Sequence, residues 1–162
     1  MRHSGHLDTV LDRINTSSSI IVSGLSFLSV IYMRNAFCST LFFGALANAA
    51  FGKLLKMIVS AERPKESKRH ASTHGMPSSH ANSLSFFTAY LSLAAFEASF
   101  SLGLVILSAT VVYTCCVCYC RIYRTRDHTV EQVFVGLCIG SISGCLVYLH
   151  VLPKVEDYAM SM

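Results

Sequence analysis

Five apolar segments make up most of this 162-residue chain, and they limit its fold more than any other feature. A helix that crosses a bilayer needs about 20 apolar residues, with a range of about 17–25. The first segment is shorter than this, and the other four fit. Only 14% of the residues are charged, so a soluble helical bundle is the less favoured alternative. The approximate limits of the segments are 18–33, 36–54, 81–99, 101–120 and 129–151.

These segments predict an all-α, multi-pass transmembrane helix bundle of about five spans, forming one domain over residues 1–162. Most of the 13 Lys and Arg residues lie in the N-terminal tail, at 53–69 or at 121–126. Because the chain reverses direction at each span, these clusters fall on one membrane face. The positive-inside tendency predicts that this face is cytosolic or, in a plastid, stromal. Nucleic-acid binding is the weaker interpretation, and no nucleic-acid partner is predicted.

Two groups of residues could be interpreted as metal sites. The run CCVCYC, residues 115–120, has no partner cluster at zinc spacing, and cysteines in apolar helices usually serve in packing. His70 and His74 lie in the basic loop 61–79, for which contact with anionic headgroups is the favoured interpretation. We therefore predict no metal and no other cofactor, and we make no prediction of the oligomeric state.

Lys56 and Arg63 lie where the second apolar segment meets water. If the helix continues, the two residues share a face and are ~10 Å apart along the axis. Pro64 then directs the chain out of the helix. Two cations on one face favour an anionic ligand. Snorkelling of Lys56 and a simple loop charge at Arg63 are the alternatives.

The stretch GMPSSH, residues 75–80, precedes the third apolar segment. Ser78 or Ser79 can cap the helix that begins here, and the N–H groups at a helix N-terminus suit a phosphate group. His80 then lies just inside the helix. A capped helix followed by a histidine without further function is the simpler alternative.

His128 begins a stripe of residues that recur every four positions in the fifth segment. The stripe continues through Gln132, Gly136, Gly140 and Gly144. Glycines at this spacing allow two helices to pack closely. The stripe is therefore expected to direct His128 towards the interior of the bundle, with a structural histidine as the alternative.

Chain topology brings two histidines, a lysine, several arginines and two hydroxyls to the same membrane face. Phosphoryl transfer needs cations and N–H groups around the phosphate oxygens, a nucleophile, and an acid for the leaving oxygen. No carboxylate pair or Cys/His cluster for magnesium or zinc accompanies them in the sequence. The chemistry is therefore expected to proceed without metal, through a nucleophilic side chain.

These motifs resemble the signature of the type 2 phosphatidic acid phosphatase (PAP2) superfamily, whose members are relatives of vanadium haloperoxidases. The signature is K-x6-R-P, then P-S-G-H, then S-R-x5-H-x3-D. Lys56 with Arg63 and Pro64 matches the first part, and PSSH is a variant of the second. GMPSSH and the run HTVEQVFVG are similar to dolichyl-diphosphatases and plastid-type lipid phosphate phosphatases. The resemblance covers roughly residues 40–145 and implies a PAP2/haloperoxidase-like helical core.

The resemblance also implies roles for individual residues. His128 attacks phosphorus and becomes a phosphohistidine. His80 protonates the departing lipid oxygen and then activates the water that hydrolyses this intermediate. The residues implied to bind the phosphate are Lys56, Arg63, Ser78, Ser79 and Arg121.

The third motif departs from the family pattern in three ways, of which the first is Cys120 in place of the serine. Gln132 replaces the acidic residue. Its amide oxygen can orient an imidazole N–H without supplying negative charge, and Glu131 is the alternative partner. Six residues separate Arg121 from His128 where the family has five. Either an insertion is tolerated here, or Arg124 binds the phosphate.

We therefore predict an integral membrane lipid phosphate phosphatase, a hydrolase of lipid metabolism. Its predicted substrate is phosphatidate or an isoprenyl diphosphate such as dolichyl diphosphate, and its predicted location is the endoplasmic reticulum or a plastid membrane. A non-catalytic, lipid-phosphate-binding membrane protein with a degenerate site is the main alternative. A vanadate-dependent oxidase is a further one.

Overall fold

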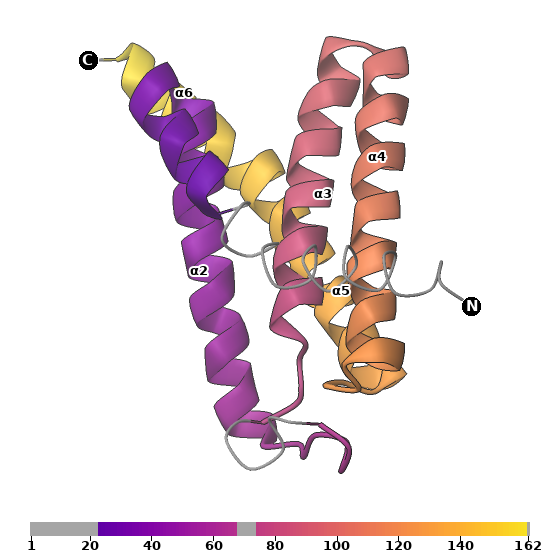
Figure 1. The fold of residues 1–162 in the computed structure, drawn as a ribbon. Coiled ribbons are helices and arrows are strands. Elements are labelled where there is room, and N and C mark those ends of the chain that lie inside the picture. The colour runs from indigo at the N-terminus through magenta and orange to yellow at the C-terminus, as the bar shows by residue number, and fades with distance from the viewer. Residues whose placement is uncertain (1–22, 68–73, 162) are drawn as a thin grey trace.

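The computed structural model of the chain describes residues 23–67 and 74–161. Residues 18–22 of the first predicted segment, and His70, lie outside the described residues. Within the described part every regular element is helical (Figure 1), which confirms the predicted fold class. The elements are a helix at Ser23–Met33, α2 (Ala36–Val59), α3 (Ser79–Ala98), α4 (Phe100–Tyr119), the π-helical turn η1 (Cys120–Arg124), α5 (Val130–Leu146), the π-helical turn η2 (Val147–Val151) and α6 (Leu152–Met160).

Three of these helical stretches are long and apolar enough to cross a membrane, counting only the described residues. They are Ala36–Val59, Phe100–Arg124 and Val130–Met160. The second and third each continue through a π-helical turn without a break. The chain is thus an all-helical membrane protein, while its division into five spans stays a prediction.

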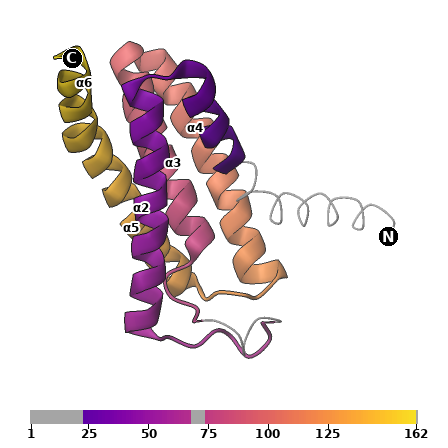
Figure 2. The ribbon, with the colours of Figure 1, turned by 90° about the vertical axis from the view of Figure 1, so that its left-hand side faces the viewer.

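The helix ends that carry the predicted motifs lie together at one end of the bundle. Figures 1 and 2 show the C-terminal end of α2, the N-terminal end of α3, η1 and the start of α5 grouped at this end, which is the lower end in both views. α3 packs against α2, α4 and α5. The loops that follow α2 and η1 therefore meet beside the first turn of α3.

The glycines of the stripe in α5 lie directly against the backbone of α3. A Cβ atom added to Gly136 would be 2.7 Å from the carbonyl oxygen of Ser78. Cβ atoms added to Gly140 and Gly144 would overlap carbonyl oxygens one and two turns further along α3. Any larger residue would force the helices apart, so these glycines set the distance between α3 and α5.

Both ends of α2 follow local sequence signals, and its C-terminal end corrects one expectation. Asn35 caps the start of α2 by accepting a hydrogen bond from the Cys38 N–H at 2.8 Å. Ser60 has a left-handed backbone, with φ of 49°, and ends the helix. The helix therefore does not continue to Arg63, which lies in the following loop and does not share a helix face with Lys56.

Aromatic packing holds the bundle together towards the other end. Phe86 and Tyr90 of α3 are fully buried, and the ring of Tyr90 meets that of Tyr148 edge-on at 5.2 Å. The Tyr148 hydroxyl donates a hydrogen bond to the Glu97 carboxylate at 2.6 Å. These contacts fasten α3 to the continuation of α5 away from the motif residues.

Candidate active site

His128 lies at the centre of the residues that the structure brings together. It precedes α5 and is only 2% exposed. Its Nε2 lies 3.3 Å from Nη1 of Arg63 and 3.2 Å from Nη2 of Arg121. Guanidinium N–H groups only donate hydrogen bonds, so Nε2 is the acceptor in both contacts. Two positive charges therefore converge on one ring nitrogen.

The other ring nitrogen of His128 determines the tautomer. Nδ1 lies 2.9 Å from the carbonyl oxygen of Gly75 and 3.3 Å from Oε1 of Gln132. Carbonyl oxygens only accept hydrogen bonds, so Nδ1 carries the proton and donates it. Nε2 consequently carries no proton of its own, and its electron pair faces the two arginines.

Several contacts fix the orientation of Gln132. Its Nε2 donates to the carbonyl oxygen of Glu62 at 2.8 Å, and Gln132 forms a capping box with Thr129 at the start of α5. A Cβ atom on Gly75 would be 2.6 Å from the Gln132 amide. A larger residue at this position would therefore displace the Gln132 amide from its place beside the ring of His128.

The surroundings of His128 keep its ring neutral. Burial, and then the positive charges of Arg121, Arg63 and Lys56, lower the pKa of His128 from 6.5 to about 3. The hydrogen bond with Gln132 opposes this shift. At neutral pH the ring therefore holds only the Nδ1 proton.

We expect this low pKa to make the protein less stable in acid. Between pH 6.5 and about 3 the unfolded chain binds a proton at His128 and the folded chain does not, so stability falls as the pH falls through this range. His128→Gln removes this contribution. Thermal unfolding in detergent and phosphate-free buffer at pH 7 and pH 4.5 should therefore show a smaller loss for His128→Gln than for the unsubstituted protein. Equal losses in the two proteins would contradict the low pKa.

Asp127 was missed by the interpretation of the sequence, although it organises both arginines. Oδ2 of Asp127 forms an ion pair with Nη1 of Arg121 at 3.1 Å, and both side chains are less than a tenth exposed. Ser67 Oγ donates to Oδ1 at 2.8 Å, and Nη1 of Arg63 donates to the Asp127 carbonyl oxygen at 2.9 Å. This residue therefore ties the loop after α2 to the loop before α5.

The Asp127 carboxyl is ionised in this setting. Burial alone would raise its pKa. The hydrogen bond from Ser67 and the charge of Arg121 outweigh burial, so the pKa lies below the ordinary value of 3.8. The negative charge neutralises part of the guanidinium charge next to His128 and orients Arg121.

The π-helical turn η1 accommodates the extra residue between Arg121 and His128. A π-helical hydrogen bond joins residues five apart and so encloses one more residue than an α-helical bond. The N–H of Thr125 donates to the carbonyl oxygen of Cys120 in this way at 2.9 Å. Arg121 is 5% exposed and contacts His128, whereas Arg124 is half-buried. Of the two arginines, the structure thus brings Arg121 to the histidine.

The start of α3 is joined directly to the start of α5. The N–H of Ser78 donates to the carbonyl oxygen of Gln132 at 3.0 Å. The Ser78 side chain is fully buried, and its Oγ has no hydrogen-bond partner among the described residues. Buried hydroxyl groups in proteins usually have a hydrogen-bond partner, so this Oγ is an exception.

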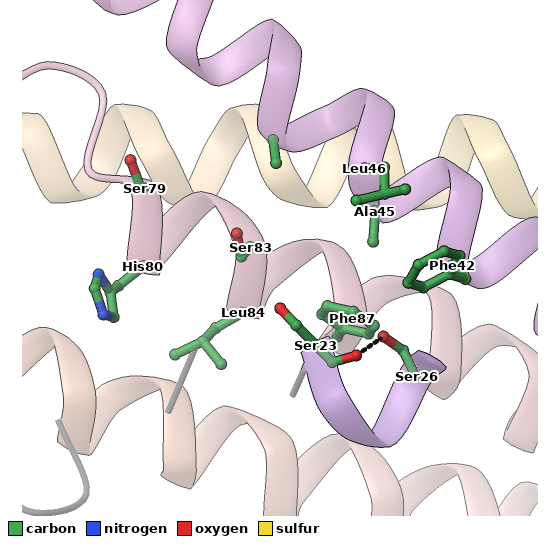
Figure 3. A pocket seen from close by; sticks show the side chains of 11 residues that line it. Ser23, Ser26, Phe42, Ala45, Leu46, Ser79, His80, Ser83, Leu84 and Phe87 are labelled. Atoms are coloured by element: carbon green, nitrogen blue, oxygen red, sulfur yellow. Dashed lines mark hydrogen bonds between the residues drawn. The ribbon is translucent and has the colours of Figure 1, made fainter. Parts of the chain in front are cut away.

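The other predicted site residues lie at the same end of the bundle. Lys56 occupies the last turn of α2, close enough to lower the pKa of His128. Ser79 and His80 form the first turn of α3 and line a cavity of about 160 Å³ (Figure 3). Ser79 is exposed, His80 is half-buried, and Glu131 is exposed. Gln132, not Glu131, contacts the histidine ring.

The PAP2 superfamily matches residues 35–156, and the chain therefore belongs to this family. The matched range includes all the residues described around His128. Within the described part, no group of three or more His, Cys, Asp or Glu side chains could hold a metal ion.

Three curated proteins illustrate what the chain is similar to. Dolichyldiphosphatase of Saccharomyces cerevisiae is 29% identical over 119 residues, covering 67% of this chain and 49% of that protein. Lipid phosphate phosphatase epsilon 1, chloroplastic, of Arabidopsis thaliana is 31% identical over 146 residues, covering 89% and 50%. Lipid phosphate phosphatase epsilon 2, chloroplastic, is 33% identical over 112 residues, covering 65% and 37%. The chain thus spans about half the length, or less, of these relatives. No solved structure matches it significantly.

Proposed function

We propose that the chain is an integral membrane phosphatase that removes phosphate from a lipid phosphate or an isoprenyl diphosphate without a metal ion. One observation carries this proposal: Nε2 of a neutral His128 faces Arg63 and Arg121. An unprotonated ring nitrogen is a nucleophile once a phosphate takes over the hydrogen bonds of the adjacent cations, and these cations attract the anion that it attacks. The names of the relatives support a lipid substrate.

In the first step Nε2 of His128 attacks phosphorus and forms a P–N bond. The bond between phosphorus and the leaving oxygen breaks, and the electron pair of that bond stays on this oxygen, which is the ester oxygen of a lipid phosphate or the bridging oxygen of a diphosphate. His80 supplies a proton to this leaving oxygen. Gln132 and the carbonyl of Gly75 hold the Nδ1 proton, so the ring keeps its orientation while positive charge develops on it.

In the second step water attacks phosphorus and the P–N bond breaks. His80 accepts a proton from the water, inorganic phosphate leaves, and His128 returns to its neutral state. Throughout both steps Arg63 and Arg121 compensate the charge on the phosphate oxygens. Lys56, Ser78 and the start of α3 at Ser79 are assigned to the same anion, since a helix N-terminus favours negative charge.

The test is release of inorganic phosphate by the full chain in detergent, with phosphatidate and with dolichyl diphosphate as substrates and a metal chelator present. We expect release from at least one of the two lipids, and no effect of the chelator. Release that depends on a divalent metal would contradict the proposal. Lipid-phosphate binding without release would favour the non-catalytic alternative, and halide oxidation with vanadate and peroxide would favour the oxidase. The endoplasmic reticulum and the plastid stay the predicted locations.

A further inference from the structure

A groove leads away from His80 along α3. The cavity of about 160 Å³ beside His80 adjoins a second cavity of about 280 Å³. Both are lined by Ser26, Leu84 and Phe87, so the two cavities lie on either side of these side chains. Figure 3 shows the first cavity, between α3, α2 and the helix at Ser23–Met33.

One face of α3 forms the floor of the groove over its whole length. His80, Leu84, Phe87 and Leu91 line it, and residues at this spacing lie on one side of a helix. From His80 to Leu91 the floor extends for ~16 Å at the helical rise of 1.5 Å per residue. The groove therefore starts at an ionisable side chain and runs in the direction of the membrane-spanning helices.

The walls of this groove suit hydrocarbon. Among the described residues, His80 and Tyr113 are the ionisable side chains that line the two cavities. Several hydroxyl groups along the walls have hydrogen-bond partners within the protein. Ser26 Oγ donates to the Ser23 carbonyl at 3.0 Å, Thr110 Oγ1 donates to the Ile106 carbonyl at 2.8 Å, and the hydroxyls of Thr88 and Thr114 lie 3.4 Å apart. Satisfied hydroxyls of this kind leave mainly carbon atoms facing the groove.

From this geometry we infer that the groove binds one hydrocarbon chain of the lipid leaving group, and that the enzyme favours lipid phosphates with a single chain. The inference rests on the proposed function, in which His80 protonates the leaving oxygen. This oxygen carries the chain directly in a lipid phosphate and through one phosphate group in an isoprenyl diphosphate. A chain attached to that oxygen enters the groove at His80 and continues past Phe87.

The size of the first cavity limits its occupant to one chain. Its volume of about 160 Å³ lies below the ~300–1,000 Å³ of pockets that enclose a whole drug-sized ligand. This space takes a short length of one chain and not two chains side by side. Small residues, Ala45, Ala49 and Ser83, leave the passage open next to His80. A single-chain isoprenyl diphosphate or a lysophosphatidate fits this groove, whereas the second chain of phosphatidate would have to lie outside it.

Ala45→Phe should obstruct the groove, and Ala47→Phe is its matched control because Ala47 is exposed on α2. We compare turnover of a single-chain isoprenyl diphosphate with that of a small water-soluble phosphate ester. Ala45→Phe should lower the ratio of lipid to soluble-ester turnover about tenfold or more, on the scale of an obstructed apolar pocket. Ala47→Phe should leave the ratio unchanged. An unchanged ratio in Ala45→Phe would overturn the assignment of the groove to the hydrocarbon chain. It would leave the proposed phosphatase activity unaffected.

A second measurement does not depend on catalysis. A single-chain lipid phosphate with a photoreactive group at the end of its chain should label the far part of the groove, near Leu91 and Tyr113. The corresponding alcohol, which lacks phosphate, should label it several-fold less. Equal labelling by the alcohol, or labelling spread over exposed positions such as Val105 and Val112, would overturn the inference. Failure of the proposed function would appear separately, as the absence of phosphate release from every substrate.

Discussion

His128→Gln is expected to lower phosphate release by at least about 10³-fold, the scale on which enzymes lose turnover when their nucleophile is removed. Glutamine approximates the volume of histidine but has no nitrogen electron pair to attack phosphorus. The measurement is inorganic phosphate released from the best lipid substrate in detergent. Rapid acid-free quenching of the unsubstituted protein should also trap phosphate on a histidine, and His128→Gln should trap none.

His80→Ala separates the two proposed roles of the histidines. If His80 is the acid and then the base, its removal slows formation and hydrolysis of the phosphohistidine but leaves His128 able to react. His80→Ala should therefore still bind phosphate covalently when a substrate with a good leaving group is supplied. Full phosphate release by His128→Gln would exclude the assigned nucleophile, whatever His80→Ala does.

Arg121→Ala is expected to have the second largest effect, because it acts on both activity and stability. The rate should fall about 10²–10³-fold, as when one donor to a developing oxyanion is removed. Stability should fall by about 3–5 kcal/mol, because the buried Asp127 carboxylate loses its partner at 3.1 Å. Phosphate release and thermal unfolding in detergent measure the two effects.

Two controls assign these effects to Arg121. Arg121→Ala with Asp127→Ala removes both members of the ion pair, so it should recover part of the stability without recovering the rate. Arg124→Ala should lower the rate less than Arg121→Ala does, because Arg121 lies 3.2 Å from Nε2 of His128. If Arg124→Ala lowers the rate more than Arg121→Ala does, the phosphate-binding role belongs to Arg124.

The architecture could be predicted from the sequence because apolar runs and a low charge content determine it locally. Glycine spacing in the fifth segment was equally informative, since Gly136, Gly140 and Gly144 do lie against α3. Chain direction predicted that Arg63, Arg121 and His128 share one membrane face, whereas their contacts with one another depend on the loops. Each of these features depends on a pattern within one segment or on the alternation of segments.

Features that depend on three-dimensional loop geometry could not be predicted in this way. Asp127 was overlooked because a carboxylate beside several arginines reads as a solvent-exposed charge, and only the fold shows it buried against Arg121. Gly75 was overlooked because the approach of its carbonyl to His128 joins loops 53 residues apart. The extra residue before His128 was visible in the sequence, but its accommodation by a π-helical turn depends on backbone hydrogen bonds.

The close contact between α3 and α5 separates the spacing of the motif-bearing helices from the choice of lipid, two properties that often change together. Main-chain atoms and glycines set the distance between α3, which carries His80, and α5, which follows His128. The spacing of their first turns therefore depends little on side-chain volume elsewhere. The opposite wall of the lipid groove comes from α2 and the Ser23–Met33 helix. Sequence changes in that wall are expected to alter which lipids are accepted and to leave the spacing of α3 and α5 unchanged.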